Sequence, residues 1–239
     1  MNRRKKLIIA ILVVILIGLL IIIAGSLFFT SNSELATGNK TILVCAIDES
    51  EERPGMGACD MAFLVSLENG SIVNYTAVYP GGMYHPTASE PQEAQAQGAG
   101  SRLLLHDSFW DADNSKGMQL AKEIVEYNTN ITIDNVVAVN SEALDAILAA
   151  ASPVEVNGTQ MNVSGIDFIR EQDWGNGVSR GDAVLEIVKA VAKSAKDPVK
   201  KSGMVNAALD QYSKGNIVMD EQSAFVSLLA SKGVETLFG

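Results

Sequence analysis

Histidine and cysteine, the residues of many catalytic and metal sites, are scarce in this sequence. Its 239 residues include only two of each, and it contains no nucleophile elbow, phosphate-binding glycine loop, His-Glu-x-x-His helix or Cys-x-x-Cys pair. His85 and His106 could form a two-histidine metal site only if the fold brings them together across the stretch that separates them. Acidic residues and arginines are therefore the main candidates for chemistry.

Positive charge is also scarce. The chain has 18 basic and 28 acidic residues, and four of the basic residues stand at positions 3–6. The remainder of the chain thus carries 14 basic against 28 acidic residues. A surface this acidic repels nucleic acid and anionic lipid head groups, which excludes both as general partners. An anionic ligand would need local arginines or a bound divalent cation.

Charge is absent altogether from Leu7 to Phe29, a segment long enough to cross a bilayer as a helix. Basic residues precede it and the next positive charge is Lys40, which predicts a cytoplasmic N-terminus and an extracellular remainder. A cleaved signal peptide is the alternative, but its apolar region is usually only about 7–15 residues long. We therefore expect a cytoplasmic basic tail (1–6), a single transmembrane helix (7–29), a tether (30–40) and an extracellular domain (41–239).

An extracellular location carries two further expectations. Asn-x-Ser/Thr sequons all follow the predicted anchor, and their number favours a glycoprotein over chance occurrence. Their asparagines are Asn39, Asn69, Asn74, Asn130, Asn157 and Asn162. Cys45 and Cys59 would be in an oxidising compartment, where they either form a disulfide across the acidic loop between them or remain buried thiols in strands.

The segment from Thr41 to Leu67 is the centre of the predicted domain. Its apolar runs, Ile42–Ile47 and Met61–Leu67, have the length and β-branched content of strands, and proline and glycine mark the polar loop between them. Asp48 ends the first run and Asp60 begins the second. If the two strands are neighbours, both carboxylates lie at the same edge of a sheet, where α/β proteins commonly bind ligands.

The chain after this segment contains both strands and helices. An Asn-Gly turn at 69–70 predicts a hairpin to a third strand over 72–79, and 83–101 is expected to be a long surface loop. We expect a helix at 118–128, a buried strand at 133–139, a second helix at 143–151 capped by Asn140 or Ser141, and a short strand at 154–156. Further helical runs are expected at 165–171, 181–194, 203–213 and 220–231. A hairpin combined with a helical crossover predicts an α/β fold, an α/β/α sandwich with a mixed central sheet.

Four charged residues are the candidates for a ligand site. Asp48 and Asp60 could hold Mg²⁺, which takes one or two carboxylates plus phosphate oxygens. Arg170 and Arg180 stand at the ends of helical runs around a glycine-rich loop at 173–177, and their guanidinium groups could grip a pyrophosphate bidentately. The alternative is that these charges form exposed ion pairs and loop caps.

Several stretches occur in an order that resembles a protein family. ILVCAIDES and GACDMAFLVSLENGSIVNYTAVYP are similar to an opening strand, an Asp-containing loop, an Arg-Ser-Asp motif and a hairpin. Residues 116–156 resemble the helix, Ile-Asp strand and next helix that follow, and GIDFIREQDWGNGVSRGDAVLEIVKAVAKSA looks like a Tyr-Val-Arg segment and an Arg-led helix. The family is the LytR-CpsA-Psr family of membrane-anchored cell-envelope phosphotransferases. ERPGMGACDMAF also resembles the opening of a related archaeal and bacterial domain of unknown function.

The resemblance implies a reaction and a site. Members of the family transfer glycan chains from a polyprenyl-pyrophosphate carrier onto a wall polymer, using Mg²⁺. By position, Asp48 and Asp60 match the aspartates that hold the metal, and Arg170 and Arg180 match two arginines that hold the pyrophosphate. The resemblance therefore implies that these four residues are catalytic, with a polyprenyl-linked glycan or cell-wall polymer as the partner.

The sequence departs from the family at two places. Pro80-Gly81-Gly82 stands where the family has Pro-Arg-Asp, and Ala58-Cys59 stands where an arginine precedes the second aspartate. Arg53 and Arg102 are the loop residues that could substitute. Two functions thus remain: a cell-envelope glycan transferase, or a non-catalytic extracellular domain that binds an envelope glycan, a lipid carrier or a protein.

Overall fold

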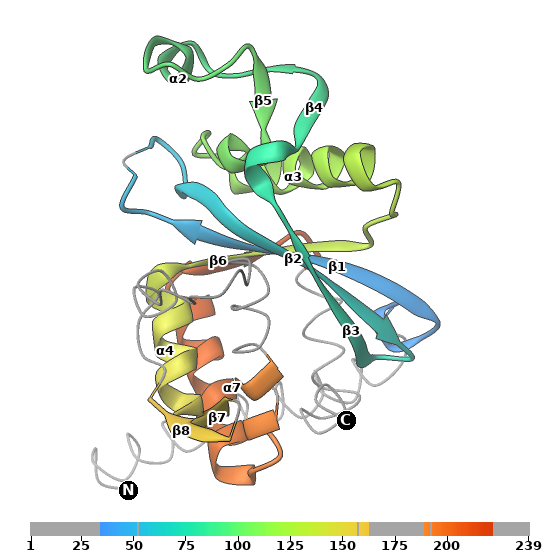
Figure 1. The fold of residues 1–239 in the computed structure, drawn as a ribbon, viewed down its shortest axis with the longest axis vertical. Coiled ribbons are helices and arrows are strands. Elements are labelled where there is room, and N and C mark those ends of the chain that lie inside the picture. The colour runs from blue at the N-terminus through green and yellow to red at the C-terminus, as the bar shows by residue number, and fades with distance from the viewer. Residues whose placement is uncertain (1–33, 52, 157, 163–188, 192, 222–239) are drawn as a thin grey trace, which may run out of the picture.

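The computed structural model describes residues 34–51, 53–156, 158–162, 189–191 and 193–221. The predicted transmembrane helix at 7–29 lies outside these residues. Within them, no helix combines the length and the apolar composition needed to cross a membrane. The described chain forms a layered α/β structure with a small projecting hairpin (Figure 1).

The centre of the fold is a five-stranded mixed sheet in the order β3-β2-β1-β6-β9. Its strands are β1 (Asn39–Asp48), β2 (Ala58–Glu68), β3 (Ser71–Val78), β6 (Asn135–Asn140) and β9 (Ile217–Met219). β1 runs antiparallel to β2 and parallel to β6, and β3 and β9 join the two sides antiparallel. The predicted hairpin is confirmed, because Asn69 and Gly70 both adopt positive φ in the turn between β2 and β3.

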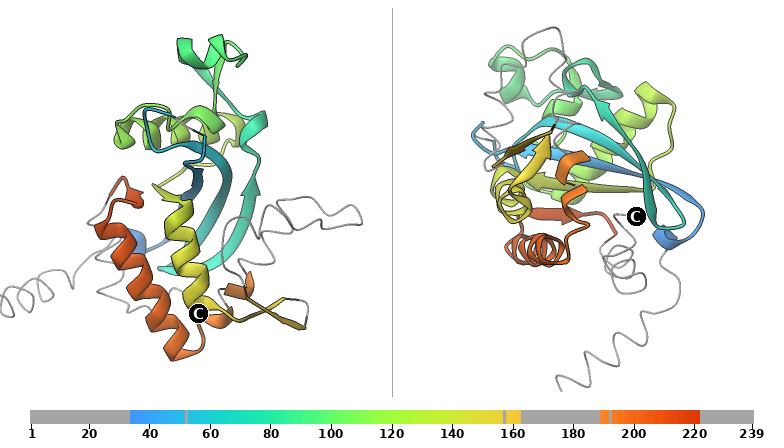
Figure 2. Two further views of the ribbon diagram at one scale, coloured as in Figure 1. Left: turned by 90° about the vertical axis from the view of Figure 1, so that its left-hand side faces the viewer. Right: turned by 60° about the horizontal axis from the view of Figure 1, so that its bottom comes forward.

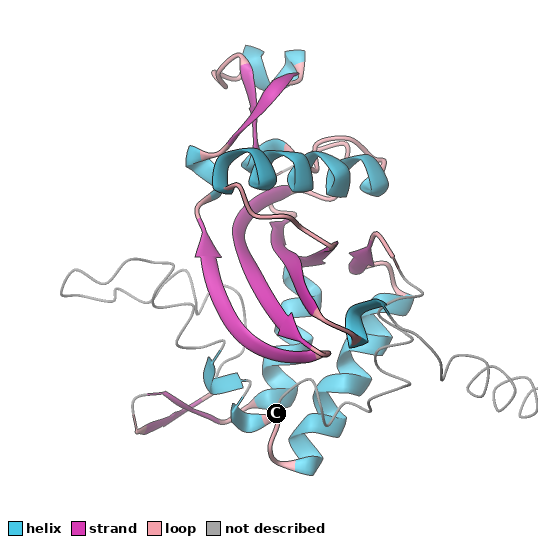
Figure 3. Ribbon diagram, turned by 90° about the vertical axis from the view of Figure 1, so that its right-hand side faces the viewer, coloured by secondary structure: helices cyan, strands magenta, loops and turns pink. Residues whose placement is uncertain are grey.

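Helices cover both faces of the sheet, as the sequence predicts. α3 (Asn114–Thr129) lies on one face, and α4 (Ser141–Ala151) and α7 (Pro198–Ser213) lie on the other (Figures 1 and 3). Each begins at a side chain that accepts hydrogen bonds from the first turn: Asp113, Asn140 and Asp197, respectively. Asn140 rather than Ser141 is the cap of α4.

Apolar side chains pack on both faces of the sheet. On the α3 face, alternate residues of β1 such as Leu43 and Ile47 pack against α3 residues such as Ile124. On the other face, Phe63 of β2 packs with the helix residues Leu148 and Met204. Because neighbouring side chains of a strand point to opposite faces, the alternation in β1 and β2 fixes which residues reach each core.

The predicted surface loop at 83–101 is instead a folded hairpin. It contains β4 (Tyr84–Ser89), α2 (Gln92–Ala96) and β5 (Arg102–Leu104), and it projects beyond α3 (Figures 1 and 2). The loop prediction was wrong because the hairpin is held by buried polar groups rather than by an apolar period. His85 donates toward Glu123 and accepts hydrogen bonds from two backbone N–H groups, while Glu90 accepts one from Leu104.

The remaining elements are short. They are the 3₁₀ turns η1 (Glu34–Ala36), η2 (Pro80–Gly82) and η3 (Leu105–Asp107), and the hairpin of β7 (Val154–Val156) and β8 (Thr159–Met161). Strand β9 was not predicted, and it occupies the residues just before the helix expected at 220–231. That helix beyond residue 221, the run at 165–171 and residues 181–188 lie outside the described part of the chain.

Candidate functional site

The polar loop between β1 and β2 is fixed against the segment that follows η3. A Cβ atom at Gly55 would overlap the carbonyl oxygens of Phe109 and Asp111, and one at Gly57 would overlap the carbonyl oxygen of Asp48. Gly57 also adopts a φ of +132°, which L side chains rarely adopt. Gly55 therefore lets the loop lie against the segment after η3, and Gly57 lets it lie against the end of β1, which brings the charged residues of the loop to the end of the sheet.

Asp60 occupies a β-bulge at the same end of the sheet. Ala46 of β1 pairs with Met61 and Ile47 pairs with Cys59, so Asp60 is the extra residue between them. A bulge turns the side chain away from the regular alternation of the strand. The Asp60 carboxylate lies beside His106 of η3, with Oδ1 3.6 Å from Nδ1.

Arg53 of the loop is a charged residue whose side chain is almost fully enclosed. Its Nη1 lies 2.7 Å from Asp107 Oδ1 and donates to the carbonyl oxygen of His106 at 2.9 Å. Its Nη2 lies 2.9 Å from Glu51 Oε2, and the guanidinium sits 5.3 Å from the centre of the Trp110 ring. A buried charge is tolerated only when it is paired in this way, so Arg53 joins the loop to η3.

The contacts of Arg53 also indicate the tautomer of a neutral His106 ring. Nη2 lies 3.1 Å from His106 Nε2, and because an arginine only donates, Nε2 must be the accepting nitrogen. The ring proton of neutral His106 is then on Nδ1, which faces Cys59 O at 3.4 Å and the Asp60 carboxylate. His106 is thus oriented with a donor toward Asp60 and a lone pair toward Arg53 and Glu51.

The carboxyl group of Glu90, close to Asp107, is also buried. Burial raises the pKa of Glu90 to about 7, and the negative charge of Asp107 adds to this effect, while a hydrogen bond from the Leu104 N–H opposes it. Glu90 Oε2 has no hydrogen-bond partner among the described residues. The interior side of the site therefore holds a carboxyl group that keeps its proton up to near-neutral pH.

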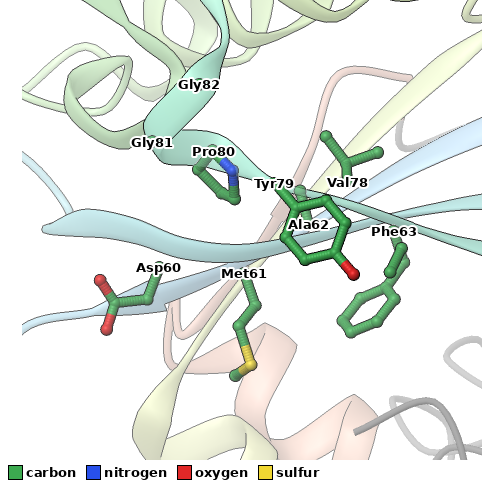
Figure 4. Close-up of a pocket in the computed structure, with 10 residues that line it drawn as sticks. Asp60, Met61, Ala62, Phe63, Val78, Tyr79, Pro80, Gly81 and Gly82 are labelled. Atoms are coloured by element: carbon green, nitrogen blue, oxygen red, sulfur yellow. The ribbon is translucent and has the colours of Figure 1, made fainter. Parts of the chain in front are cut away.

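An open pocket of about 460 Å³ begins at Asp60. It is lined by residues 60–63 of β2 and residues 77–82, from the end of β3 through η2. In Figure 4 the Asp60 carboxylate lies at one end of the pocket, while the side chains of Met61, Tyr79 and Phe63 lie along it. Asp60 therefore stands where a charged cluster meets an apolar groove.

The two predicted aspartates lie at the same end of neighbouring strands, as expected. Asp48 is buried at the end of β1, and its Oδ1 accepts a hydrogen bond from the N–H of Ser50 at 2.9 Å. Asp60 is partly exposed and belongs to the cluster with His106. Arg170 and Arg180 lie outside the described residues.

The structure also describes the two cysteines and the two histidines. Cys45 and Cys59 are both buried free thiols, and the pKa of Cys59 is raised well above its usual range, first by a hydrogen bond with Cys45 and then by burial. His85 and His106 do not form one metal site, because His85 pairs with Glu123, with Nε2 2.7 Å from Oε2.

Sequence reasoning missed Glu51, His106 and Asp107 as members of the site. A charged residue in a loop and a His-Asp pair at a strand end have no local pattern that joins them. One signal was present: Pro54 and the glycines that follow it mark a turn tight enough to fold the loop back on the sheet.

Comparison with known proteins gives one family and a set of structures. The model of the family described as "Protein of unknown function (DUF4012)" matches residues 37–172. No curated protein matches the chain.

Solved structures with a similar fold cover most of the chain. Protein gbs0355 from Streptococcus agalactiae is 16% identical, with a TM-score of 0.56, and the match covers 82% of this chain and 74% of that one. TagV from B. subtilis is 14% identical, with a TM-score of 0.50 and coverage of 84% and 83%. A structure of TagT bound to LIIa-WTA is 12% identical, with a TM-score of 0.50 and coverage of 82% and 76%. At these identities the likeness is one of fold.

Proposed function

The chain belongs to the DUF4012 family, and on that premise we propose that it is a membrane-anchored protein of the cell envelope that transfers a glycan from a polyprenyl-pyrophosphate carrier to a wall polymer. The predicted helix at 7–29 would hold the domain outside the membrane, beside a membrane-embedded carrier. The fold shared with TagT, which has been solved with LIIa-WTA bound, supports a ligand of this class.

The position of Asp60 is the observation that carries this proposal. A polyprenyl-pyrophosphate has an apolar chain and an anionic head group joined at one point. The pocket offers an apolar lining along Met61, Phe63 and Tyr79, and it ends at a charged cluster. Its volume of about 460 Å³ falls within the range of small-molecule sites, roughly 300–1,000 Å³. The isoprenoid would occupy the pocket and the pyrophosphate would lie near Asp60.

Different residues of the chain would bind the metal ion and the pyrophosphate. Asp48 and Asp60, at the same end of β1 and β2, would hold Mg²⁺, for which carboxylate oxygens are suitable ligands. Arg170 and Arg180 would bind the pyrophosphate oxygens. A bound divalent cation would neutralise charge on the pyrophosphate, which an acidic cluster alone would repel.

The transfer itself exchanges one oxygen–phosphorus bond for another. An acceptor hydroxyl would form a bond to the glycan-linked phosphorus, and the bridging bond of the pyrophosphate would break, so that polyprenyl monophosphate leaves. The hydroxyl proton would pass to the Asp60 carboxylate, which is partly exposed. His106, with its Nδ1 proton facing Asp60, would hold that carboxylate in place.

A second function is favoured by one observation. Arg53, in the loop between β1 and β2, is enclosed by Glu51, Asp107 and His106, and Gly81 and Gly82 bring no charge to the pocket. This arrangement suits a non-catalytic domain that binds an envelope glycan, the lipid carrier or a protein.

Mass spectrometry of lipids that co-purify with the full-length protein tests the proposal. We expect polyprenyl phosphates with the wild type and their loss in an Asp60→Ala, Arg180→Ala double variant, while the control Asp111→Ala retains them. Incubation with a polyprenyl-pyrophosphate-linked glycan and an acceptor polymer should then release polyprenyl monophosphate. Bound lipid without release would favour the non-catalytic domain, and no bound lipid in either protein would refute transfer and leave only the binding of a glycan or a protein.

A further inference from the structure

Positive charge is concentrated in one short segment around the start of α7. Residues 189–201 contain five lysines and a single acidic residue, Asp197, while the other positions after residue 6 carry nine basic against 27 acidic residues. The lysines are Lys189, Lys193, Lys196, Lys200 and Lys201. We call residues 193–201 the basic corner, because the chain turns there from a helical run into α7. A local excess of this sign on an acidic chain indicates contact with an anionic partner.

The basic corner is exposed and has an apolar tip. Asp197 caps α7 by accepting hydrogen bonds from the N–H groups of Val199 and Lys200, at 2.8 and 3.4 Å. Val199 is 80% exposed, the highest value of any large apolar residue in the described part of the chain. In two views the first turn of α7 lies at the end of the molecule opposite to the projecting hairpin (Figures 1 and 2). The corner therefore lies away from both the sheet and that hairpin.

Two lysines hold the corner in place, and two others form no ion pair. Lys193 Nζ lies 3.4 Å from a carboxylate oxygen of β7, and Lys200 donates a hydrogen bond to the carbonyl oxygen of Pro153, just before that strand. Lys196 and Lys201 form no ion pair with any residue that the structure describes. Their charges are therefore available to an external anion.

We propose that the basic corner rests on the anionic head groups of the membrane that the predicted helix at 7–29 would cross. Lysines beside such a surface are attracted by its phosphate groups, and an exposed apolar residue such as Val199 is stabilised by entering the interface. A soluble polyanion would attract the same lysines but would not bury the valine. The apolar tip thus favours a lipid surface over a polymer.

The described chain begins on the same face of the sheet as α7. Leu35 of η1 belongs to a cluster against which Val44 and Val137 pack. Both valines also pack, together with Tyr212 of α7, against a second cluster on this face. Only residues 30–33 separate the predicted anchor from η1, and this stretch spans at most about 18 Å. The anchor would therefore hold the α7 face of the sheet near the bilayer.

The rest of the domain would not compete for the membrane. Outside residues 189–201 the acidic residues outnumber the basic ones, so anionic head groups repel the other surfaces and contact is confined to the corner. Phe63, which lines the pocket, packs in one cluster with Met204 of α7. Contact through the corner would thus also set how the pocket faces the bilayer. The inference rests on the predicted anchor and not on the transfer reaction.

A fluorophore at residue 199 of the full-length protein tests the inference. Val199→Cys would carry an environment-sensitive dye, while Cys45 and Cys59 are buried thiols and should remain unlabelled. The protein would be reconstituted into nanodiscs of phosphatidylcholine, alone or in an equal mixture with phosphatidylglycerol, with spin-labelled lipid as the quencher. We expect a blue shift and strong quenching with the anionic lipid, and neither in phosphatidylcholine alone. The same dye at Gly100→Cys, on the projecting hairpin, should remain unquenched in both.

Removal of the two lysines without an ion pair should weaken the contact. Each lysine near an anionic surface contributes roughly fivefold to binding, so Lys196→Gln with Lys201→Gln should weaken it roughly 25-fold. Lys116→Gln with Lys122→Gln removes the same charge from α3, on the other face of the sheet, and should leave quenching at residue 199 unchanged. Because the dye is itself apolar, loss of quenching in the lysine variant would show that charge drives the contact.

Quenching that is absent with the anionic lipid, equal in the two lipids or unchanged in the lysine variant would overturn the inference. If inorganic polyphosphate bound to the wild type but not to the lysine variant while the dye remained in water, the occupant would be a soluble polyanion instead. Absence of co-purifying polyprenyl lipid would refute transfer and leave the membrane contact unaffected, so the two failures are distinguishable.

Discussion

Arg53 and Asp107 form a buried ion pair that joins two segments 54 positions apart in the sequence. Nη1 lies 2.7 Å from Oδ1, and the side chains are only 5% and 7% exposed. The pair closes the loop after β1 onto η3 and so sets the positions of Glu51 and His106.

Replacement of Arg53 by Met should destabilise the fold strongly. Asp107 would remain buried without its partner, and breaking a buried pair typically costs about 3–5 kcal/mol. Urea unfolding would measure the loss, and the Arg53→Met, Asp107→Leu double variant should recover much of it. Lys116→Met, which breaks the exposed pair with Asp111, serves as the control and should leave the unfolding midpoint unchanged. Equal effects of the two single variants would contradict the role given to the buried pair.

Glu90 should make stability depend on pH. Its pKa is raised from 4.5 to about 7, so the folded state binds a proton that the unfolded state has lost between these values. The contribution of Glu90 to stability should therefore be highest below pH 4.5. It should fall by up to about 3 kcal/mol as the pH rises from 4.5 through 7.

Glu90→Gln removes this titration and keeps an oxygen that can accept from the Leu104 N–H. We expect the variant to gain stability relative to wild type at pH 8 but not at pH 4.5, as measured by urea unfolding at both values. If the difference in stability between the variant and the wild type were the same at both pH values, Glu90 would not titrate between them.

Gly81→Arg should strengthen pyrophosphate binding. A Cβ at Gly81 meets no heavy atom within 4 Å, so the substitution fits, and residue 81 lines the pocket that begins at Asp60. One charge-assisted hydrogen bond contributes about 1.5–3 kcal/mol, or roughly ten- to 150-fold in affinity. Calorimetry with a short-chain polyprenyl pyrophosphate would measure it. Gly100→Arg places the same charge at an equally open position on the projecting hairpin and should have no effect.

Gly57→Ala should be more harmful than Gly98→Ala. Both glycines have a positive φ, of +132° and +101°, so both variants carry backbone strain of about 1–3 kcal/mol. Only at Gly57 does the added Cβ also overlap a backbone atom, the carbonyl oxygen of Asp48. The unfolding midpoints should differ accordingly. If the two variants were equally stable, the close approach of the loop to β1 would add nothing to the cost of substituting Gly57.

Much of the fold was predictable because its signals are local. The β-branched runs of β1 and β2, the Asn69-Gly70 turn and the Asn140 cap each act within a few residues, and all are confirmed. The resemblance to a domain of unknown function is likewise confirmed, since the chain belongs to the DUF4012 family, and solved structures such as TagV share its fold. The short strand β9 was missed because three residues carry too little periodicity to distinguish a strand from the start of a helix.

The candidate site was less predictable because its contacts are distant in sequence. Asp60 could be identified from its place at the start of β2, but the bulge that turns its side chain depends on pairing with β1. The burial of Arg53 depends on Asp107 and Trp110, and nothing in the loop itself indicates either partner. The roles of Arg170 and Arg180 remain predictions.

The bulge between β2 and β3 has a consequence for self-association. Among the described strands, β3 is at an edge of the sheet, and edges readily pair with other chains. Ser66 pairs with Asn74 and Leu67 pairs with Ile72, so Val73 is the extra residue of a bulge. The bulge interrupts the regular row of backbone N–H and C=O groups on the free side of β3. Asn74 is also the asparagine of a sequon, and a sugar attached there would shield the same edge. The bulge thus makes the strand beside the pocket a poorer template for pairing with another chain.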